Sequence, residues 1–207
     1  MAAPKKQERE YTVPQVSAIL GLSQQEVNNA LERDLKPFGV AKLGQGIRMV
    51  STKGLMALEL LRAFAKMFQP GLRSLLIKEA LRSPTKQKVS AENVVVYIAE
   101  YMKSVRRRKS RLVEAEALVT TNPDVLSGEP CIKGTRAPVY LIGALARKHG
   151  IAKAHKTYPF IAVEKIELLA LYVTAYPRRG RPPETTLPPP KTPTKRGKTK
   201  KVKVAGI

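Results

Sequence analysis

The sequence predicts a mainly α-helical protein: a winged helix-turn-helix-like N-terminal domain with a short β-ribbon, a second trihelical, homeodomain-like domain, and a disordered basic C-terminal tail. Three observations lead to this fold class. Two short amphipathic segments near the N-terminus are separated by a glycine turn, apolar residues recur at helical spacing through the middle of the chain, and the last segment is rich in proline, lysine and arginine. We expect four regions: a DNA-binding domain at 1–82, a connecting or dimerisation region at 83–112, the trihelical domain at 113–177 and the tail at 178–207.

The first element is a helix followed by a sharp turn and a second helix. Thr12 can cap the first helix, and Pro14 falls in its first turn, where a missing amide hydrogen is tolerated. Gly21 permits the turn, and Ser23 with Glu26 forms a capping box that opens the second helix. This spacing is that of a helix-turn-helix, whose inward-facing residues we expect to be Val16, Leu20, Leu22, Val27 and Ala30.

The outward face of the second helix is rich in amide side chains. Amide and guanidinium groups can form paired hydrogen bonds with base edges in the major groove. We therefore expect this face to contact DNA through Gln24, Gln25, Asn28, Asn29 and Arg33. A helical hairpin with a purely structural role is the alternative, because helix-turn-helix patterns also arise by chance.

A β-ribbon follows the two helices. Residues 40–50 read as two short strands around a glycine-flanked turn. Lys42 and Arg48 lie at the edges of this ribbon, where they could contact phosphates as the wing of a winged helix. The composition agrees, since 38 Lys and Arg against 16 Asp and Glu give a formal net charge of +22 and favour a polyanionic partner. Charge alone does not distinguish nucleic acid from an acidic protein or anionic lipid.

Apolar spacing predicts two helices after the ribbon. The first begins near Thr52 and ends before Pro70, and the second covers residues 72–81. One stripe of the second helix fits either a dimer seam or the core of the domain, and its members are Leu72, Leu75, Leu76 and Ala80. We expect the chain to form a homodimer.

Two features of the connecting region have open interpretations. The run 94–98 is β-branched, which favours a strand, yet the residues 90–92 before it resemble a helix start. The basic cluster 106–109, with Arg111, could contact phosphates or an acidic partner, or form the solvated end of a helix. The sequence leaves both choices open.

The second domain begins with a turn-rich segment in which glycines and prolines restrict the backbone. Helices are predicted over residues 138–148, 152–156 and 163–176, separated by glycine and proline breaks. Three short helices in this order suggest a homeodomain-like unit.

The turn-rich segment contains the pattern Gly128-x-Pro130-x-Ile132-x-Gly134-Thr135-Arg136. Together with the three helices, it resembles a widespread bacterial and archaeal family of domains of unknown function found in VapB-like antitoxins. The resemblance covers about a third of the chain and rests on Pro123, Gly128, Pro130, Ile132, Gly134, Thr135, Arg136, Pro138, Val139, Gly150, Tyr158 and Pro159. The sequence departs from the family at Ala162, where Ser or Thr usually caps the last helix, so this helix could begin differently or fray.

The resemblance implies a function. The family domain, preceded by a helix-turn-helix and followed by a basic tail, is similar to the longer VapB antitoxins of type II toxin-antitoxin pairs. Such a protein would neutralise a small PIN-like ribonuclease toxin through its C-terminal region and repress its own operator by binding double-stranded DNA. The alternative is a free-standing transcriptional regulator or architectural protein without a toxin.

Single residues of the second domain offer little chemistry. Arg136 could contact phosphate, or could hold its turn by bonding backbone carbonyls. Cys131 lies in a segment that we expect to be packed, and His149 and His155 lack a metal-binding spacing. Because no activated nucleophile, acidic cluster or phosphate-binding loop is recognisable, we expect no enzyme activity, no cofactor and no metal.

The tail begins with Arg178-Arg179-Gly180-Arg181-Pro182. The part from Arg179 to Pro182 resembles the core of an AT-hook, whose arginines enter a narrow minor groove. In the antitoxin interpretation the same arginines would lie against the acidic active site of the toxin. A solvated basic end without a specific partner is the third possibility.

Cysteine usage and hydropathy bear on the cellular compartment. A single cysteine excludes an internal disulfide framework and fits a reducing cytoplasm. Residues 1–10 are polar and charged, unlike a secretory signal, and no apolar run is long enough to cross a bilayer. We therefore expect a cytoplasmic protein without a membrane partner.

Overall fold

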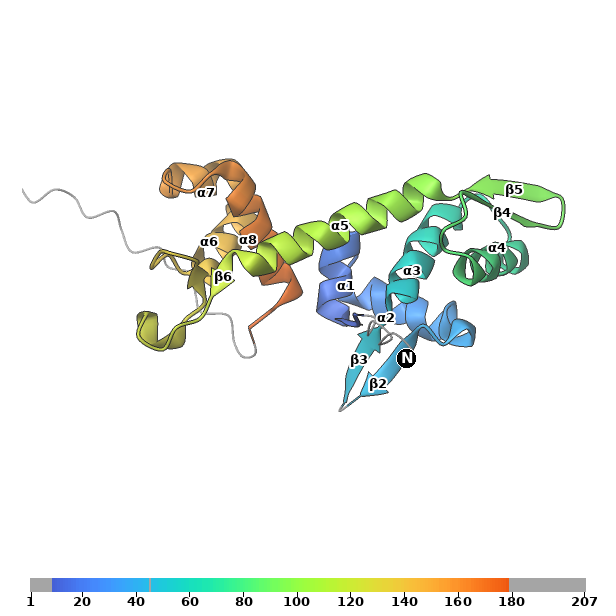
Figure 1. Ribbon diagram of the computed structural model, residues 1–207, viewed down its shortest axis with the longest axis horizontal. Coiled ribbons are helices and arrows are strands. Elements are labelled where there is room, and N and C mark those ends of the chain that lie inside the picture. The colour runs from blue at the N-terminus through green and yellow to red at the C-terminus, as the bar shows by residue number, and fades with distance from the viewer. Residues whose placement is uncertain (1–8, 45, 179–207) are drawn as a thin grey trace, which may run out of the picture.

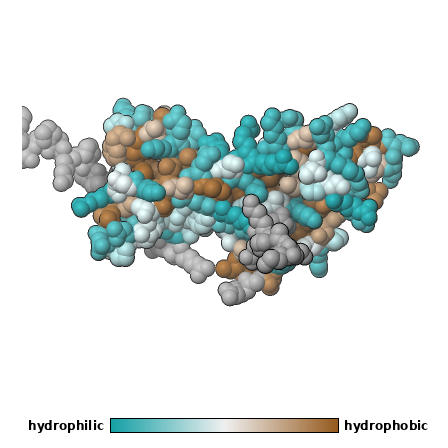
Figure 2. Space-filling model, in the orientation of Figure 1, coloured by the Kyte–Doolittle hydropathy of each residue, from teal (hydrophilic) through white to brown (hydrophobic). Residues whose placement is uncertain are grey.

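The computed structural model describes residues 9–44 and 46–178, which are mainly helical, and so confirms the expected fold class. Figure 1 shows two groups of helices near opposite ends of one long helix, α5 (Ala99–Ala117). Figure 2 shows hydrophilic side chains over most of the visible face, interrupted by small apolar areas. In the described part of the chain, no helix combines the length and the apolar character needed to cross a membrane.

The N-terminal group begins with a winged helix-turn-helix. Its elements are β1 (Tyr11–Thr12), α1 (Val13–Leu20), α2 (Gln24–Arg33), a 3-10 turn (Lys36–Phe38), β2 (Ala41–Gly44) and β3 (Ile47–Val50). The antiparallel sheet has the order β1-β3-β2, so the expected ribbon is present. The strand β1 was not predicted, because two residues before a helix carry no readable alternation. Tyr11 pairs with Val50, and both are buried.

Local signals set the ends of the first two helices. The Oε1 atom of Gln15 accepts from the backbone N–H of Thr12 at 2.8 Å, and Gly21 ends α1 in the left-handed conformation with φ 67°. Ser23 and Glu26 form the predicted capping box at the start of α2, with hydrogen bonds of 2.7 and 3.1 Å. The residues expected to face inward do so: Val16, Leu20 and Val27 are buried, and Leu22 and Ala30 pack against the same core.

Two helices and a hairpin follow the wing. These are α3 (Thr52–Phe64), α4 (Pro70–Arg82), β4 (Lys88–Ala91) and β5 (Val94–Tyr97). The run 94–98, for which helix and strand were both open, is therefore a strand up to Tyr97. Residues 90–92 belong to β4 and its turn, where Glu92 adopts a positive φ of 51°, so they do not begin a helix.

The apolar stripe of α4 serves mainly as core. Leu76 and Ala80 are buried, and Leu72 packs against the same cluster. Leu75 is the exception at 46% exposed. The stripe is therefore not available as a continuous dimer seam.

The C-terminal group contains the predicted trihelical unit. Its elements are β6 (Val119–Thr120), a 3-10 turn (Leu126–Gly128), β7 (Cys131–Ile132), α6 (Val139–His149), α7 (Ile151–Thr157) and α8 (Val163–Ala175). Each helix begins and ends within one residue of the predicted position. At Ala162 no side chain caps α8, yet the helix starts at Val163 as expected.

The crossing of α6 and α8 depends on one glycine. A Cβ atom at Gly143 would lie 2.8 Å from the backbone oxygen of Leu169 and 2.5 Å from Cγ2 of Val173. Only a residue without a side chain allows the two helices to approach so closely. This glycine lies inside the helix, where the sequence alone gave no reason to single it out.

The two helical groups pack against each other through α8. Helix α8 packs against α6 of its own group and also against α1 and α5. Its last buried residue, Ala175, belongs to the N-terminal core cluster, whereas Ile166 and Leu169 belong to the C-terminal one. The long helix α5 runs through the expected boundary at 112/113: it contributes Met102, Val105 and Leu112 to the N-terminal cluster and also packs against α8.

Candidate nucleic-acid interface

The exposed face of α2 carries the polar residues predicted to contact DNA. Gln24, Gln25, Asn29 and Arg33 are exposed, and Asn28 is half-buried. The opposite face of α2 is buried in the N-terminal core, which holds the helix against α1. The helix therefore presents amide and guanidinium groups to solvent from a fixed support.

Arg48 of the wing bonds to α2. Its guanidinium donates to Oδ1 of Asn28 and to Oε1 of Glu32, both at 2.9 Å. Two residues predicted as separate DNA contacts thus bond to each other and fix the wing against the helix. Glu32, one turn after Asn28, is 62% exposed and brings a carboxylate to this face. Charged hydrogen bonds of this kind are strong enough to order the two elements relative to one another.

The tip of the wing is apolar. Leu43 and Ile47 are 76% and 41% exposed, although they lie in strands of a small sheet. The wing projects beyond the core, so neither face of its tip has a helix to cover it. Lys42 is the exposed cation of this ribbon and contacts Glu10 at 3.5 Å, a surface ion pair of small energetic value.

One further cation lies beside α2. Lys36 opens the 3-10 turn directly after α2 and is exposed. Within the part of the chain that the structure describes, neither Lys36 nor Arg33 forms an ion pair. Lys36 was not among the predicted contacts, and its signal in the sequence was its position shortly after the predicted helix.

The N-terminal cap of α2 depends on ionisation. Hydrogen bonds from the side chain and then the backbone of Ser23 lower the pKa of the Glu26 carboxyl below its ordinary value. The carboxylate is therefore charged at neutral pH, where it also suits the positive end of the helix dipole. The cap stabilises the first turn of α2, which includes Gln24 and Gln25.

In the second group, the family motif forms a folded turn. The hydroxyl of Thr135 donates to the backbone oxygen of Ile132 at 2.9 Å and accepts from the N–H of Ala137 at 3.1 Å. Thr135 thus closes the turn that Arg136 was one candidate to hold. Arg136 itself is exposed and has no hydrogen bond or ion pair to another described residue.

Cys131 and His155 bond to backbone oxygens, and His149 is exposed at the end of α6. Cys131 is buried at 1% exposed, and its thiol donates to the backbone oxygen of Glu129 at 3.2 Å. Nδ1 of His155 lies 3.0 Å from the backbone oxygen of Ile161. Among the residues that the structure describes, no three side chains of the metal-binding types lie together.

The basic cluster of the connecting region lies in the middle of α5, not at its end. Arg108 donates to both carboxylate oxygens of the buried Glu59, at 2.7 and 3.4 Å, and to the backbone oxygen of Leu20 at 3.4 Å. Arg62 reaches the same carboxylate at 3.1 Å. Arg111 pairs with Glu167 of α8 at 2.7 Å. Arg108 and Arg62 thus tie α5 and α3 to the end of α1 within the N-terminal group, and Arg111 joins α5 to α8 of the C-terminal group.

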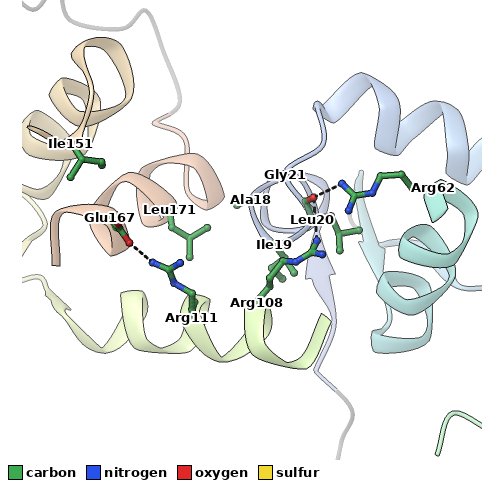
Figure 3. A pocket seen from close by; sticks show the side chains of 10 residues that line it. All are labelled: Ala18, Ile19, Leu20, Gly21, Arg62, Arg108, Arg111, Ile151, Glu167 and Leu171. Carbon is green, nitrogen blue, oxygen red and sulfur yellow. Dashed lines mark hydrogen bonds and ion pairs between the residues drawn. The ribbon is translucent and has the colours of Figure 1, made fainter. Parts of the chain in front are cut away.

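Figure 3 shows these side chains around the groove where the two groups meet. The groove, of about 680 Å³, has an apolar lining from Ile19, Ile151 and Leu171. Arg108 and Arg62 point at the C-terminal end of α1, and Arg111 points at α8. The arginines that line it already have acidic or carbonyl partners, so the groove is a structural seam.

Tyr176, directly after α8, also links the two helical groups through hydrogen bonds. The hydroxyl of Tyr176 donates to Glu116 at 2.6 Å and accepts from Nε2 of Gln15 at 2.8 Å. Burial, followed by the bond to Glu116, raises the pKa of Tyr176 to about 12. Glu116 also pairs with Arg9. Residues from α1, α5 and α8 thus meet at one hydroxyl group.

The first tail residue is anchored. The guanidinium carbon of Arg178 lies 4.3 Å from the ring centre of Tyr140, and Arg178 also pairs with Glu129. The sequence predicted Arg178 as a tail contact for toxin or DNA, whereas here it bonds within the second group. The other predicted tail residues, Arg179, Gly180, Arg181 and Pro182, lie outside the described residues.

Comparisons with known proteins cover part of the chain. Residues 119–173 match the model of a family described as "Protein of unknown function (DUF433)". The chain is 35% identical over 94 residues to an uncharacterised protein, y4eO, of Sinorhizobium fredii (strain NBRC 101917 / NGR234). This match covers 45% of the chain and 42% of the relative, so the chain spans less than half of that protein. No solved structure matches.

Proposed function

We propose that the chain is a DNA-binding antitoxin that represses its own operator through the winged helix-turn-helix and neutralises a ribonuclease toxin through its C-terminal region. The observation that carries the DNA-binding part is the exposed amide face of α2, held by a buried opposite face and by the Arg48 bridge to the wing. A rigidly supported helix of this kind can enter the major groove with its first turns toward the bases. The formal charge of +22 supplies the general attraction to DNA.

The toxin-binding part rests on the resemblance of the motif region and on the composition of the tail. Arg178 is tied to Glu129 and Tyr140, so the tail leaves the body at the second helical group. The arginines that follow would be delivered to a partner bound beside that group. An acidic ribonuclease active site is a partner of fitting charge.

A free-standing regulator without a toxin is the second candidate. One observation favours it: the candidate base-reading residues all belong to α2 and the wing, outside the matched residues 119–173. DNA binding by this face requires no toxin. The two candidates therefore differ in the partner of the C-terminal region and agree on the recognition helix.

The DNA-binding part is tested by anisotropy titration of the full chain against DNA from upstream of its own gene and against a scrambled duplex. We expect Gln25→Ala to reduce the preference for the upstream DNA by about 5- to 150-fold, the range of one base contact. Gln87→Ala removes the same side chain from an exposed position in the loop before β4 and should leave the preference unchanged. Equal binding of both duplexes by the unmodified chain would reject the proposal.

The toxin-binding part is tested with the product of the adjacent gene. The chain is compared with a version that ends after Arg178, which keeps the contacts of that residue with Glu129 and Tyr140. We expect the shortened chain to lose affinity for the neighbouring protein and to keep its preference for the upstream DNA. If the full chain binds no neighbouring product but prefers the upstream DNA, the free-standing regulator is the correct interpretation.

A further inference from the structure

The β4–β5 hairpin lies at the end of the molecule away from the C-terminal group (Figure 1). Strand β4 packs against α4, and its Val89 is buried. Strand β5 reads Val-Val-Val-Tyr, without a charged residue or proline, and pairs in a regular register without a bulge. Edge strands of natural proteins often contain a charged residue, a proline or a bulge, each of which hinders pairing with a further strand. β5 contains none of these three features.

Some backbone N–H and C=O groups of β5 point away from β4. Hydrogen-bonded and non-hydrogen-bonded residue pairs alternate along an antiparallel ladder. The N–H of Ile98 donates to the oxygen of Gln87 at 2.8 Å, so these residues form a hydrogen-bonded pair. Counting from this pair, Tyr97 and Val95 fall in non-hydrogen-bonded pairs, and their N–H and C=O groups face away from β4. In the part of the chain that the structure describes, no backbone bond outside the ladder involves either residue.

The side chains of the same two residues are exposed. Val95 and Tyr97 are 57% and 72% exposed on one face of the hairpin, while Val94 and Val96 are half-buried on the other. An apolar strand with an open edge and an exposed apolar face is a template for adding another strand.

We propose that β5 pairs antiparallel with β5 of a second copy of this chain, about a two-fold axis at Val96. Val95 then lies opposite Tyr97 of the partner subunit, and the two residues exchange both backbone hydrogen bonds. The two-fold axis repeats this pair, so the hairpins form one sheet with an isologous interface. Each valine also gains a cross-strand contact with a tyrosine ring, a favourable pairing in sheets.

A second copy suits this edge better than another protein does. The chain has a net charge of +22, so two copies repel over most of their surfaces and can approach only where charge is absent. The uncharged β5 is such a place, and its sequence supplies complementary groups to itself. The inference rests on the proposed function in one respect: a two-fold dimer would place two recognition helices on a palindromic operator.

Sedimentation velocity of the full chain over a range of concentrations tests the interface. We expect a reversible dimer whose dissociation constant rises at least about tenfold in Val95→Lys, because the two-fold axis repeats the new charge beside the same edge. Ser90→Lys is the matched control. It adds the same charge to the residue opposite Val95, on the same face but at the β4 edge, and should leave dimerisation unchanged.

Amide hydrogen exchange followed by NMR gives a readout specific to the edge. The amides of Val95 and Tyr97 should exchange slowly at high concentration and quickly on dilution, while Val96, bonded within the hairpin, should not respond. A monomeric chain, an unchanged dimer in Val95→Lys, or an equal loss in Ser90→Lys would each overturn the proposal. Protection of these amides only when the neighbouring gene product is added would assign the edge to that protein instead.

The outcome separates this inference from the proposed function. A monomer that prefers its upstream DNA would reject the β5 interface and leave DNA binding in place. A dimer sensitive to Val95→Lys that shows no DNA preference would support the interface and reject the DNA-binding proposal.

Discussion

The two helical groups use their polar residues in opposite ways. In the N-terminal group, the amides of α2 and Arg33 face solvent, supported by a buried face on the same helix. In the C-terminal group, Thr135 of the motif closes a turn and Arg178, directly after α8, pairs with Glu129, so both serve the fold, whereas Arg136 of the motif is exposed. A polar residue in a recognisable pattern is therefore a stronger sign of binding where its helix has a separate buried face than where it lies in a turn.

The largest effect should come from the ion cluster around Glu59, which ties α5 to α3 within the N-terminal group. Glu59→Ala leaves Arg108, half-buried, without its carboxylate, and we expect a loss of about 3 kcal/mol in the free energy of unfolding. Urea denaturation measures it. As a control, Glu167→Gln removes an exposed partner of Arg111 and should cost less than about 1 kcal/mol. Similar losses for the two variants would mean that the buried carboxylate of Glu59 matters no more to stability than an exposed ion pair.

The next effect concerns packing within the C-terminal group. Gly143→Ala places a Cβ against the backbone of Leu169, and overpacking of this kind costs about 1–3 kcal/mol. Gly71→Ala in α4 meets open space and should be neutral or stabilising. Thermal unfolding of both variants gives the comparison. Equal melting temperatures would show that α6 and α8 do not need their close approach.

The tyrosine junction should contribute a smaller amount. Tyr176→Phe removes the bonds to Glu116 and Gln15, and we expect a loss of about 1–2 kcal/mol at neutral pH. Because the folded pKa of Tyr176 is about 12 and lies above its unfolded value, this stability is present below the unfolded pKa near 10. It is lost as the pH rises toward 12.

Urea denaturation at pH 7 and at alkaline pH tests the sign. The difference between the unmodified chain and Tyr176→Phe should shrink as the pH rises. Tyr101→Phe serves as the control, since this tyrosine is half-buried and its hydroxyl forms no hydrogen bond to another described residue. A difference that grows with pH would contradict the raised pKa.

The smallest effect concerns the start of α2. Ser23→Ala removes the cap of α2 and should destabilise it by about 1 kcal/mol. The lowered pKa of Glu26 means that its part of the cap is present above the unfolded pKa and lost as the pH falls through the folded one. NMR chemical shifts of Gln24 and Gln25 across that acidic range should report fraying. Unchanged shifts would indicate that packing alone holds the first turn.

Local chemistry explains why much of the fold was predictable. The helix-turn-helix, the wing and the three C-terminal helices follow from caps, glycine turns and apolar spacing, all of which act over a few residues. The strand β1 and the hairpin were missed or undecided, because pairing with a partner strand decided between helix and strand there. β-propensity depends on such context more than helix propensity does.

The candidate site was predictable in its residues and not in its connections. The amide face of α2 follows from helical periodicity, since residues three and four apart share a face. The bond of Arg48 to Asn28 and Glu32 joins residues 20 and 16 positions apart, and no local rule pairs them. The apolar wing tip at Leu43 and Ile47 also depends on how far the ribbon projects beyond the core.

By itself, the sequence determined most of the helices and their ends, the cationic character and the polar face of α2, because each depends on neighbouring residues or on composition. It did not predict the long helix α5. Only the tertiary structure decided which arginines are available for binding and which are not. Arg108 and Arg111 lie in one basic cluster, yet the first bonds to a buried carboxylate and the second to α8. Their partners, Glu59 and Glu167, are brought near by packing across the chain, and burial of a carboxylate demands a cation at that place.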